Sequence, residues 1–350
     1  MPRLGVVLAV ALLLAACGPD PSAAPAVVAP RDADAPPFLI IWAGDTLLGD
    51  AAQPHLDQRG YAWPFAQLAD ALAADFTVVN LEGPITADAT PWDPGQRWSY
   101  NAQPESAAAL AAAGVDAAGM ANNHALDRGP EGVSATVDAL AAAGLIGFGA
   151  GRDPAAKQPL LIETPHGVVG VVAFEADVDF ERRATTHRAG TIAPTAPAVA
   201  RGIALARAAG ARWVVAFVHW GENYTAVDEA QRRAARRFAA AGYDLVVGHG
   251  PHHAQPVELI GSMPVFYSLG NFVFGTPGRY GPDAPGYSLL LTTPVGADGI
   301  RAAELRCLLT DNRRVRFQPR LCPSAEARAM LAALHPDVEL SGDVATLRWR

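Results

Sequence analysis

The chain has 350 residues, of which half are hydrophobic and 18% are charged. This composition excludes wholesale disorder and predicts a globular protein with one large domain or two smaller ones. Its 27 Lys and Arg and 35 Asp and Glu give a formal net charge of −8, and no basic run stands out. We therefore expect no nucleic-acid partner, and a small or weakly charged ligand fits the composition better.

The first 16 residues have the pattern of an export signal. Arg3 precedes an apolar run at residues 4–16, which is too short to span a membrane. The run ends in Leu-Ala-Ala-Cys-Gly at Cys17, which resembles the bacterial lipobox, whose cysteine is lipidated and becomes the mature N-terminus. A lipoprotein signal is favoured over an ordinary signal peptide cleaved nearby. We expect an exported cell-envelope lipoprotein, anchored in the membrane through Cys17.

Three further segments are expected after the signal. Residues 17–37 are rich in Pro, Ala and Asp without hydrophobic periodicity, which predicts a tether. The folded body is expected over residues 38–323 and a C-terminal extension over residues 324–350. Cys307 and Cys322 form either one disulfide or two unpaired buried thiols, and the sequence leaves both open.

From residue 38 onward, apolar runs typical of buried strands alternate with helical patterns. The strands of this part are expected at residues 38–42, 76–79, 115–120, 145–148, 213–218 and 244–247. Helices are expected to begin at Pro64, Pro104 and Pro130. Shorter β-like segments follow at residues 257–260, 265–267, 287–292, 300–307 and 313–317, with no long helix before Ser324. The alternation predicts an α/β fold, with the later strands in a second sheet or at a β edge.

Polar side chains follow the carboxyl ends of five predicted strands. They are Asp45, Glu82, Asn123 with His124, His219 and His249. Each alone has an ordinary interpretation, such as a turn former or a buried core histidine. Because ligands of α/β folds gather beyond strand ends, we expect these side chains to lie together. Their oxygen and nitrogen donors suit Zn, Mn, Fe or Mg, and the absence of thiols excludes a structural zinc finger.

Six short motifs occur in a fixed order between residues 38 and 275. They are Trp42-Ala43-Gly44-Asp45, Asn80-Leu81-Glu82-Gly83-Pro84, Ala121-Asn122-Asn123-His124-Ala125-Leu126-Asp127, His219-Trp220-Gly221, Gly248-His249-Gly250-Pro251-His252 and Tyr267-Ser268-Leu269-Gly270-Asn271-Phe272. This series resembles the CapA family of poly-γ-glutamate capsule synthesis proteins, which is related to the calcineurin-like metallophosphoesterases. The resemblance implies an α/β (α+β) fold, a four-layer αββα sandwich with one or two divalent metal ions at the strand ends between two sheets.

The resemblance also implies a role for each site residue. Asp45, Glu82, Asn123, His219, His249 and His252 would be metal ligands. His124 would be the general acid or a transition-state stabiliser, and Asp127 would fix its tautomer. The sequence leaves open whether His249 or His252 is the closer ligand, and whether one or two ions bind.

Two functions remain open at this point. The first is a metal-dependent hydrolase of the phosphoesterase type, acting in capsule, poly-γ-glutamate or other envelope polymer biosynthesis. The second is a polymer-binding or assembly factor without hydrolysis. In either case the partner is an envelope polymer or a small phosphate or carboxylate compound. The loop that carries Trp92, Trp98 and Tyr100 would wall a substrate cleft or cover a sheet edge, and its polar residues favour the cleft.

Overall fold

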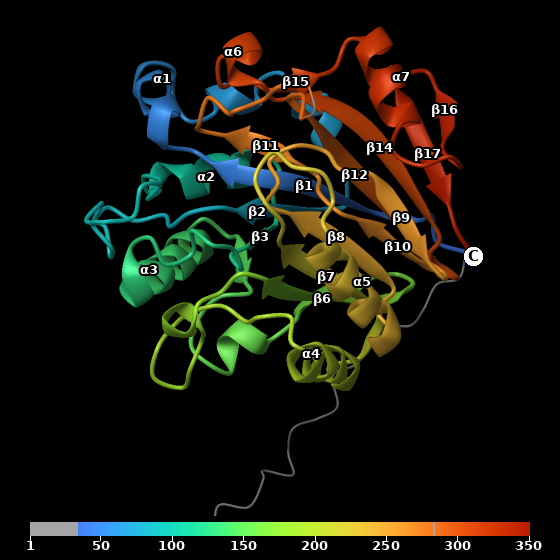
Figure 1. Cartoon of the computed structure of the whole chain (residues 1–350), viewed down its shortest axis with the longest axis horizontal. Helices are drawn as coiled ribbons and strands as arrows, with labels where there is room; N and C mark the ends of the chain where they lie inside the picture. The colour runs from blue at the N-terminus through green and yellow to red at the C-terminus, as the bar shows by residue number, and fades with distance from the viewer. Residues whose placement is uncertain (1–33, 283) are drawn as a thin grey trace, which may run out of the picture.

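The computed structural model describes residues 34–282 and 284–350 (Figure 1). The predicted signal, Cys17 and most of the tether lie outside these residues. The β-strands are β1 (Phe38–Leu47), β2 (Phe76–Leu81), β3 (Ala117–Gly119), β4 (Ile146–Phe148), β5 (Leu160–Thr164), β6 (Gly167–Glu175), β7 (Ala211–His219), β8 (Leu245–His249), β9 (Val257–Ile260), β10 (Met263–Phe266), β11 (Asn271–Phe274), β12 (Tyr287–Gly296), β13 (Gly299–Ile300), β14 (Ala302–Leu309), β15 (Arg320–Leu321), β16 (Glu339–Ser341) and β17 (Val344–Arg348). The α-helices are α1 (Gln53–Arg59), α2 (Glu105–Ala112), α3 (Gly129–Ala142), α4 (Ala196–Ala208), α5 (Glu229–Ala241), α6 (Asn312–Val315) and α7 (Ser324–Ala332).

The strands form two sheets. The larger sheet has the order β16-β17-β14-β12-β1-β2-β3-β4, and β11, β13 and β15 pair beside this path. The smaller sheet has the order β5-β6-β7-β8-β10-β9. β1 to β4 run parallel to one another, as do β6, β7 and β8, so the carboxyl ends of each set lie along one edge of its sheet.

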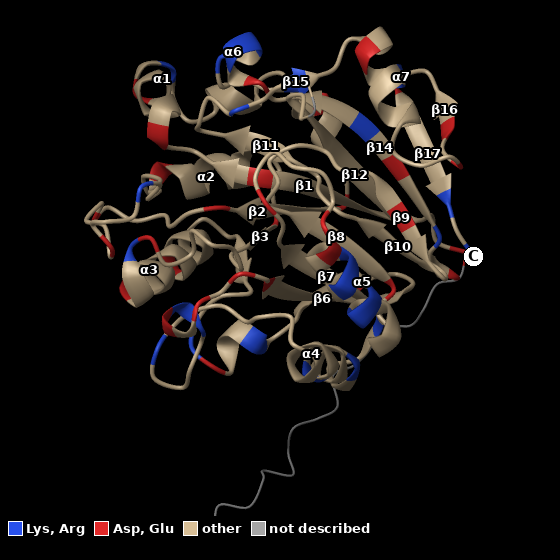
Figure 2. Cartoon of the chain, in the orientation of Figure 1, with Lys and Arg blue, Asp and Glu red and all other residues tan. Residues whose placement is uncertain are grey.

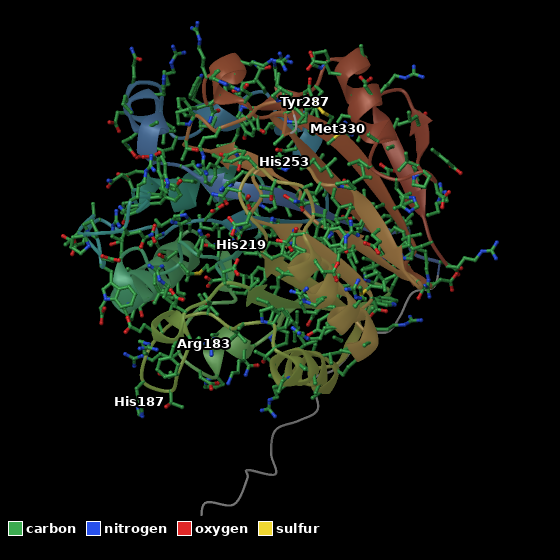
Figure 3. All side chains as sticks on the ribbon, in the orientation of Figure 1. Arg183, His187, His219, His253, Tyr287 and Met330 are labelled. Atoms are coloured by element: carbon green, nitrogen blue, oxygen red, sulfur yellow. A yellow bond between two sulfur atoms is a disulfide. The ribbon has the colours of Figure 1, made fainter. Side chains whose placement is uncertain are left out.

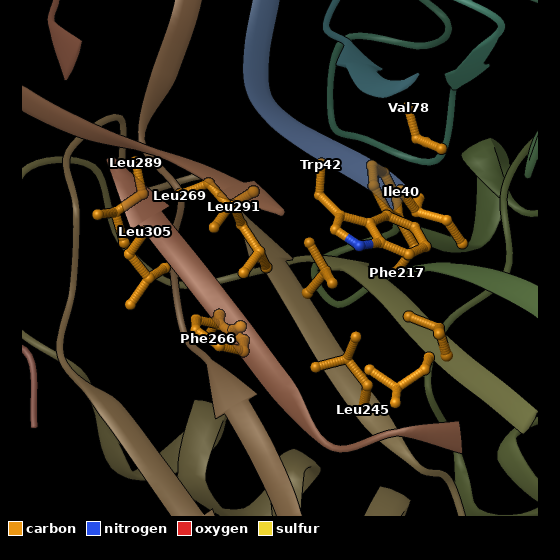
Figure 4. Packing of buried hydrophobic residues seen from close by; sticks show 14 of the residues in the cluster. Ile40, Trp42, Val78, Phe217, Leu245, Phe266, Leu269, Leu289, Leu291 and Leu305 are labelled. Atoms are coloured by element: carbon orange, nitrogen blue, oxygen red, sulfur yellow. The ribbon is translucent and has the colours of Figure 1, made fainter. Parts of the chain in front are cut away.

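Side-chain alternation along the strands produces the layers. In β7, Phe217 faces the cluster between the two sheets, whereas its neighbour Val218 faces the cluster under α4 and α5. In β1, Trp42 likewise lies between the sheets and packs against Phe217 (Figure 4). Ala43 faces the other side of the larger sheet, where residues of α2 and α3 pack. The order is helix, sheet, sheet, helix, which confirms the predicted four-layer αββα sandwich.

Capping explains where the helices of the outer layers begin and end. The side chain of Asp228 accepts a hydrogen bond from the backbone N–H of Gln231, and Gln231 reaches back to the Asp228 N–H, forming a capping box before α5. Gly242 ends α5 in the left-handed conformation, with φ at 88°. Figure 2 shows that charged residues gather on such outer helices and on loops, while most of the strand surface carries other residues.

Two segments differ from the sequence-based expectation. Residues 313–317 were expected to be β-like, but Asp311 caps the N-terminus of the short helix α6 and accepts a hydrogen bond from the Arg313 N–H. Residues near Pro64 form separate 3₁₀ turns, Trp63–Phe65 and Ala69–Leu72, in place of one helix. The cap at Asp311 is a local hydrogen-bonding effect that hydrophobic periodicity does not report.

The C-terminal residues contribute to the body. Residues 324–350, expected as an extension, form α7, β16 and β17, and β17 pairs with β14 in the larger sheet. Cys307 in β14 forms a disulfide with Cys322, which resolves the alternative that the sequence left open. Among residues 34–282 and 284–350, no helix combines the length and apolar character that crossing a membrane requires.

Candidate metal centre

The alternation that builds the core also directs the polar side chains at the strand ends. In β7, His219 points to the same side of the sheet as Phe217, two residues earlier. In β8, His249 likewise points to the same side as Val247. In β2, Asn80 continues the face of Val78, and Glu82 follows two residues later. These ends therefore point into the space between the sheets, beyond the apolar core. His219 lies near the middle of the molecule (Figure 3).

A β-bulge brings Asp45 onto the same face. The pairing of β1 with β2 runs from Ala43 opposite Val79 directly to Asp45 opposite Asn80, so Gly44 is the extra residue. A Cβ on Gly44 would lie 1.8 Å from the carbonyl oxygen of Gly270, so the close approach of the two backbones requires glycine here. The Gly44-Asp45 motif thus positions a carboxylate at the end of β1.

Glu82 is the centre of a histidine cluster. Its Oε1 lies 3.6 Å from His219 Nε2, 3.8 Å from His252 Nε2 and 3.9 Å from His124 Nε2. The Glu82 side chain is fully buried, and neither of its oxygens has a hydrogen-bond partner among the described residues. Three ring nitrogens thus surround a carboxylate at distances too long for hydrogen bonds.

Asp45 is the second carboxylate around which side chains of the site gather. Its Oδ2 lies 3.1 Å from His252 Nδ1, and its Oδ1 lies 3.6 Å from His249 Nδ1 and accepts a 2.8 Å hydrogen bond from Asn80 Nδ2. His252 Nδ1 also lies 3.0 Å from Asn271 Oδ1. With its Nδ1 used in this way, His252 presents Nε2 toward Glu82.

Burial and charge set the protonation of this cluster. Burial opposes ionisation of Asp45, but its hydrogen bond with His252 and the neighbouring imidazoles lower its pKa from 3.8 to about 2. Burial also opposes protonation of His252, but the charges of Glu82 and Asp45 raise its pKa to about 9. His249 has less compensation, and burial lowers its pKa to about 3. His249 is therefore a neutral imidazole at pH 7, the form that binds metals.

The donor set fits a divalent metal ion. One ligand atom each from Asp45, Glu82 and His252 lie within 4.8 Å of one another, and all three residues are buried. Two ligands bound at about 2.0–2.2 Å to one ion are separated by roughly 3–4 Å, which matches the spacing around Glu82. His219 Nε2 and both ring nitrogens of His249 are also buried without a hydrogen-bond partner in the described part of the chain. Buried polar atoms without a partner are costly, and a cation would satisfy the lone-pair nitrogen of each imidazole.

The imidazole of His124 is oriented by Asp127 at the edge of the cluster. Its Nδ1 lies 2.7 Å from Asp127 Oδ2, which fixes the tautomer with the proton on Nδ1 and leaves Nε2 free. The ring of Tyr100 covers the imidazole at a centroid distance of 4.1 Å. His124 is thus oriented by a buried carboxylate, the arrangement that the sequence implies for it.

The neighbouring asparagines differ in placement. Asn122 is buried and donates hydrogen bonds to Asn80 Oδ1 at 3.2 Å and to the Leu81 carbonyl at 2.7 Å. Asn123, expected as a metal ligand, is exposed and lies at the wall of the pocket described next. The structure therefore brings Asp45, Glu82, His124, His219, His249 and His252 together around the cluster, with Asp127 behind His124 and Asn123 at the edge.

A pocket of about 390 Å³ opens beside the cluster. Both His124 and His252 line it. Trp98 and Tyr100 form part of its wall, so they border a cleft as the polar loop suggested. The remaining lining residues are Gln96, Arg97, Asn123, Asn223, Tyr224, Thr276, Pro277, Gly278 and Arg279.

Several site residues were not assigned a role from the sequence. Asn80 and Asn271 lie opposite Asp45 in the pairing of β1 with β2 and β11, and both belong to motifs quoted above. Glu175 ends β6 on the same face as Ala173, beside His219 in the pairing. Alternation along these strands was the available signal. Tyr224 and Arg279 lie in irregular segments, where no periodicity marks them.

A family model described as "Bacterial capsule synthesis protein PGA_cap" matches residues 39–276. The chain belongs to this family. The matched range includes every residue of the cluster, from Asp45 to His252, as well as the aromatic wall of the pocket.

Sequence relatives agree with this assignment, and a solved structure shares the fold. The chain is 29% identical over 236 residues to the "PGA biosynthesis protein CapA" of Bacillus subtilis, covering 67% of this chain and 62% of the relative. It is 34% identical over 228 residues to a "Probable polyglutamine synthesis accessory protein" of Mycobacterium tuberculosis, covering 61% and 60%. The chain thus spans about three fifths of the length of these relatives. A novel phosphatase from Mycoplasma pneumoniae shares the fold, with a TM-score of 0.50, 13% identity and coverage of 79% of this chain and 95% of that chain.

Proposed function

We propose that this protein is an exported, metal-dependent hydrolase of the phosphoesterase type that acts in the biosynthesis of capsule, poly-γ-glutamate or another envelope polymer. The observation that carries the proposal is the environment of Glu82. A fully buried carboxylate without a hydrogen-bond partner in the described chain is surrounded by three imidazoles beside a pocket. A divalent ion would satisfy Glu82 together with His219 and His252, while His124 stays available to the substrate.

The residues divide into those that hold the ion and those that handle the substrate. Asp45, Glu82, His219, His249 and His252 would hold it, and Asn123 is the further ligand that the family resemblance implies. When bound, the ion stabilises charge on phosphoryl oxygens and activates water. His124 would act as an imidazolium: Asp127 holds its Nδ1–H, and its Nε2–H donates a proton or hydrogen bond to the leaving group.

The biological role is supported by the names of the relatives. The Bacillus subtilis protein is described as a PGA biosynthesis protein and the Mycobacterium tuberculosis protein as a probable polyglutamine synthesis accessory protein. We extend a role in polymer synthesis to this chain. The substrate would be an envelope polymer or a small phosphate or carboxylate compound that enters the pocket.

One experiment separates hydrolysis from binding alone. The folded body, residues 34–350, is purified after loading with Mn, Zn, Fe or Mg, and its metal content is measured together with hydrolysis of an aryl phosphate monoester and diester. We expect metal near one or two ions per chain and hydrolysis that a chelator abolishes. Glu82→Gln, which removes the central charge and keeps the side-chain volume, should lose both. Bound polymer without any ester hydrolysis would support the assembly factor in place of the enzyme.

We also propose that a lipid on Cys17 tethers the protein to the membrane, with residues 18–37 as the spacer. In the natural host, Cys17→Ser should move the protein from the membrane fraction to the soluble envelope fraction. The melting temperature should be unchanged, because the substituted position precedes the folded body. Retention of the variant in membranes would contradict the lipoprotein assignment.

A further inference from the structure

Two arginines at the pocket have no part in the proposed chemistry. Arg97 and Arg279 both line the pocket that contains His124 and His252. Each guanidinium lies 5.1 Å from the centroid of an aromatic ring, Arg97 over Trp98 and Arg279 over Tyr224. Within residues 34–282 and 284–350, neither guanidinium has an ion-pair partner. Two unpaired cations are therefore exposed at one pocket.

The residue beneath Arg279 is held rigidly against the metal centre. Tyr224 and His252 both have φ at 62°, a strained conformation for residues other than glycine that persists where the surroundings enforce it. Their rings lie 5.6 Å apart, and the Tyr224 N–H donates a 2.9 Å hydrogen bond to the Pro251 carbonyl. Tyr280 packs edge-on against Tyr224. Arg279 thus rests on a ring that is fixed relative to His252.

The loop that carries Arg97 is fixed relative to His124. Gln96 Nε2 donates hydrogen bonds to the Trp98 carbonyl at 2.6 Å and to Asp127 Oδ1 at 2.7 Å. Arg182 donates to Gln96 Oε1 at 2.8 Å and to the Asn123 carbonyl at 2.9 Å, which joins this loop to the turn before His124. Arg279 therefore packs on a ring that contacts His252, and Arg97 lies in a loop that is hydrogen-bonded to the residues around His124.

Charge complementarity identifies what this pair recognises. The chain carries a net charge of −8, and buried carboxylates lie at the floor of the site. Two unpaired cations at the mouth of the pocket therefore create a local positive potential in a negatively charged protein. A guanidinium stacked on an aromatic ring is pre-oriented to bind carboxylate or phosphate oxygens. By contrast, Arg232 also lies over a ring, that of Tyr267, but is paired with Glu258 at 2.6 Å.

We propose that Arg97 and Arg279 form an anion subsite that binds a second acidic group of the substrate while the first lies at the metal centre. The inference rests on the proposed function, because it assumes that the reacting group of the substrate binds at the metal centre. It narrows the substrate class to molecules with at least two acidic groups separated along their length. The recognised group is a carboxylate or a phosphate, and these share the same hydrogen-bonding chemistry.

Calorimetric titration of the metal-loaded protein tests this subsite with two probes. A γ-linked pentaglutamate carries separated carboxylates, and inorganic tripolyphosphate carries linked phosphates. Arg97→Gln and Arg279→Gln should each weaken binding of the recognised probe by about tenfold or more, since hydrogen bonds to charged groups contribute about 1.5–3 kcal/mol. Inorganic phosphate, which needs the metal centre alone, should bind all variants equally. Arg279→Lys keeps the charge without the planar fork and should lie between wild type and Arg279→Gln.

Arg59→Gln is the matched control. Arg59 is exposed and also lies 5.1 Å from a ring centroid, that of Trp63, but neither residue lines the pocket. If the Arg97→Gln/Arg279→Gln variant binds both probes as tightly as Arg59→Gln does, the subsite is overturned, even where aryl phosphate hydrolysis persists. If the double variant loses probe binding while no ester is hydrolysed, the subsite stands and the proposed enzymatic function falls. The probe whose affinity drops identifies the acidic group.

Discussion

The carboxylate of Asp127 lies 2.7 Å from Nδ1 of His124, and the same carboxylate accepts hydrogen bonds from the loop that forms the pocket wall. The Tyr100 N–H donates to Oδ2 at 2.6 Å and Gln96 donates to Oδ1 at 2.7 Å. One buried acid therefore orients a reactive imidazole and positions the loop above it. Disturbing it should affect both the chemical step and substrate binding.

Asp127→Asn should lower kcat by at least about a hundredfold and raise KM, while metal content stays at the wild-type level. The amide can present N–H groups to Nδ1 in place of an acceptor, which favours the wrong tautomer. Steady-state kinetics and metal analysis on the same preparation measure this. Asp88→Asn, an exposed acid in the same loop, is the control. Loss of metal equal to that in Glu82→Gln would place Asp127 among the groups that hold the ion.

His124→Ala should keep its metal and lose about 10²–10⁴-fold in kcat. The loss should shrink for an ester whose leaving group needs no protonation, because His124 acts there through a proton or hydrogen bond. Kinetics with a series of aryl phosphates of falling phenol pKa measure this trend. Asn123→Ala, measured in parallel, should lower metal content according to the ligand role that the family resemblance implies. A metal-free His124→Ala protein would mean that His124 itself is a ligand.

The adjacent asparagines should respond differently in stability. Asn122→Ala leaves the Leu81 carbonyl and Asn80 without their buried donor and should reduce the free energy of unfolding by about 1–3 kcal/mol. Asn123→Ala removes an exposed amide and should stay within about 0.5 kcal/mol of wild type in the presence of chelator. Urea denaturation of both variants gives the comparison. Equal losses would show that burial does not distinguish the two positions.

Metal should stabilise the wild-type protein and have no effect on Glu82→Gln. An ion that binds the native state alone adds about 4 kcal/mol at a thousandfold excess over Kd, so chelation should lower the melting temperature and remetallation should restore it. In chelator, Glu82→Gln should be about as stable as wild type, because it removes a buried carboxylate without a hydrogen-bond partner in the described chain but also loses the attraction between Glu82 and His252. Thermal unfolding of both proteins, with and without chelator, measures the change in melting temperature that metal causes in each. A variant that is much less stable than wild type in chelator would argue against this account of Glu82.

Glu175 predicts a dependence of stability on pH. Burial raises its pKa above 4.5, although a hydrogen bond from Thr191 and the charges of His219 and Arg182 act in the opposite direction. The folded state therefore holds the proton more tightly than the unfolded state, and this site loses stability as pH rises from about 4.5 through the raised pKa. Glu175→Gln keeps the acceptor for Thr191 and should be more stable than wild type at pH 8, with the difference vanishing near pH 4. Denaturation midpoints at several pH values measure it, and a pH-independent difference would contradict it.

Residues on regular strands could be predicted, because alternation and parallel pairing place their ends at one edge. Glu82, His219 and His249 follow directly from this rule. Asp45 obeys it through a bulge at Gly44, where the backbone of Gly270, far along the chain, leaves no room for a side chain. Periodicity carries no information on such contacts.

Irregular and C-terminal segments were less accessible from the sequence. Tyr224 and Arg279 meet through loops whose conformations depend on tertiary packing. β17 pairs with β14 in the larger sheet. The short apolar pattern of β17 does not indicate which strand it pairs with. The aromatic wall was expected from the polarity of its loop, yet its attachment to Asp127 required the hydrogen bonds of the folded chain.

The candidate ligands are divided between the two sheets. Asp45 and Glu82 come from the ends of β1 and β2, while His219 and His249 come from β7 and β8. An ion held by both sets would act as a cross-link between the two halves of the sandwich, closing a long loop of chain much as a disulfide does. Separation of the sheets and release of the ion would then be one event, so hydrogen exchange at the carboxyl ends of β1 and β7 should report on the same opening.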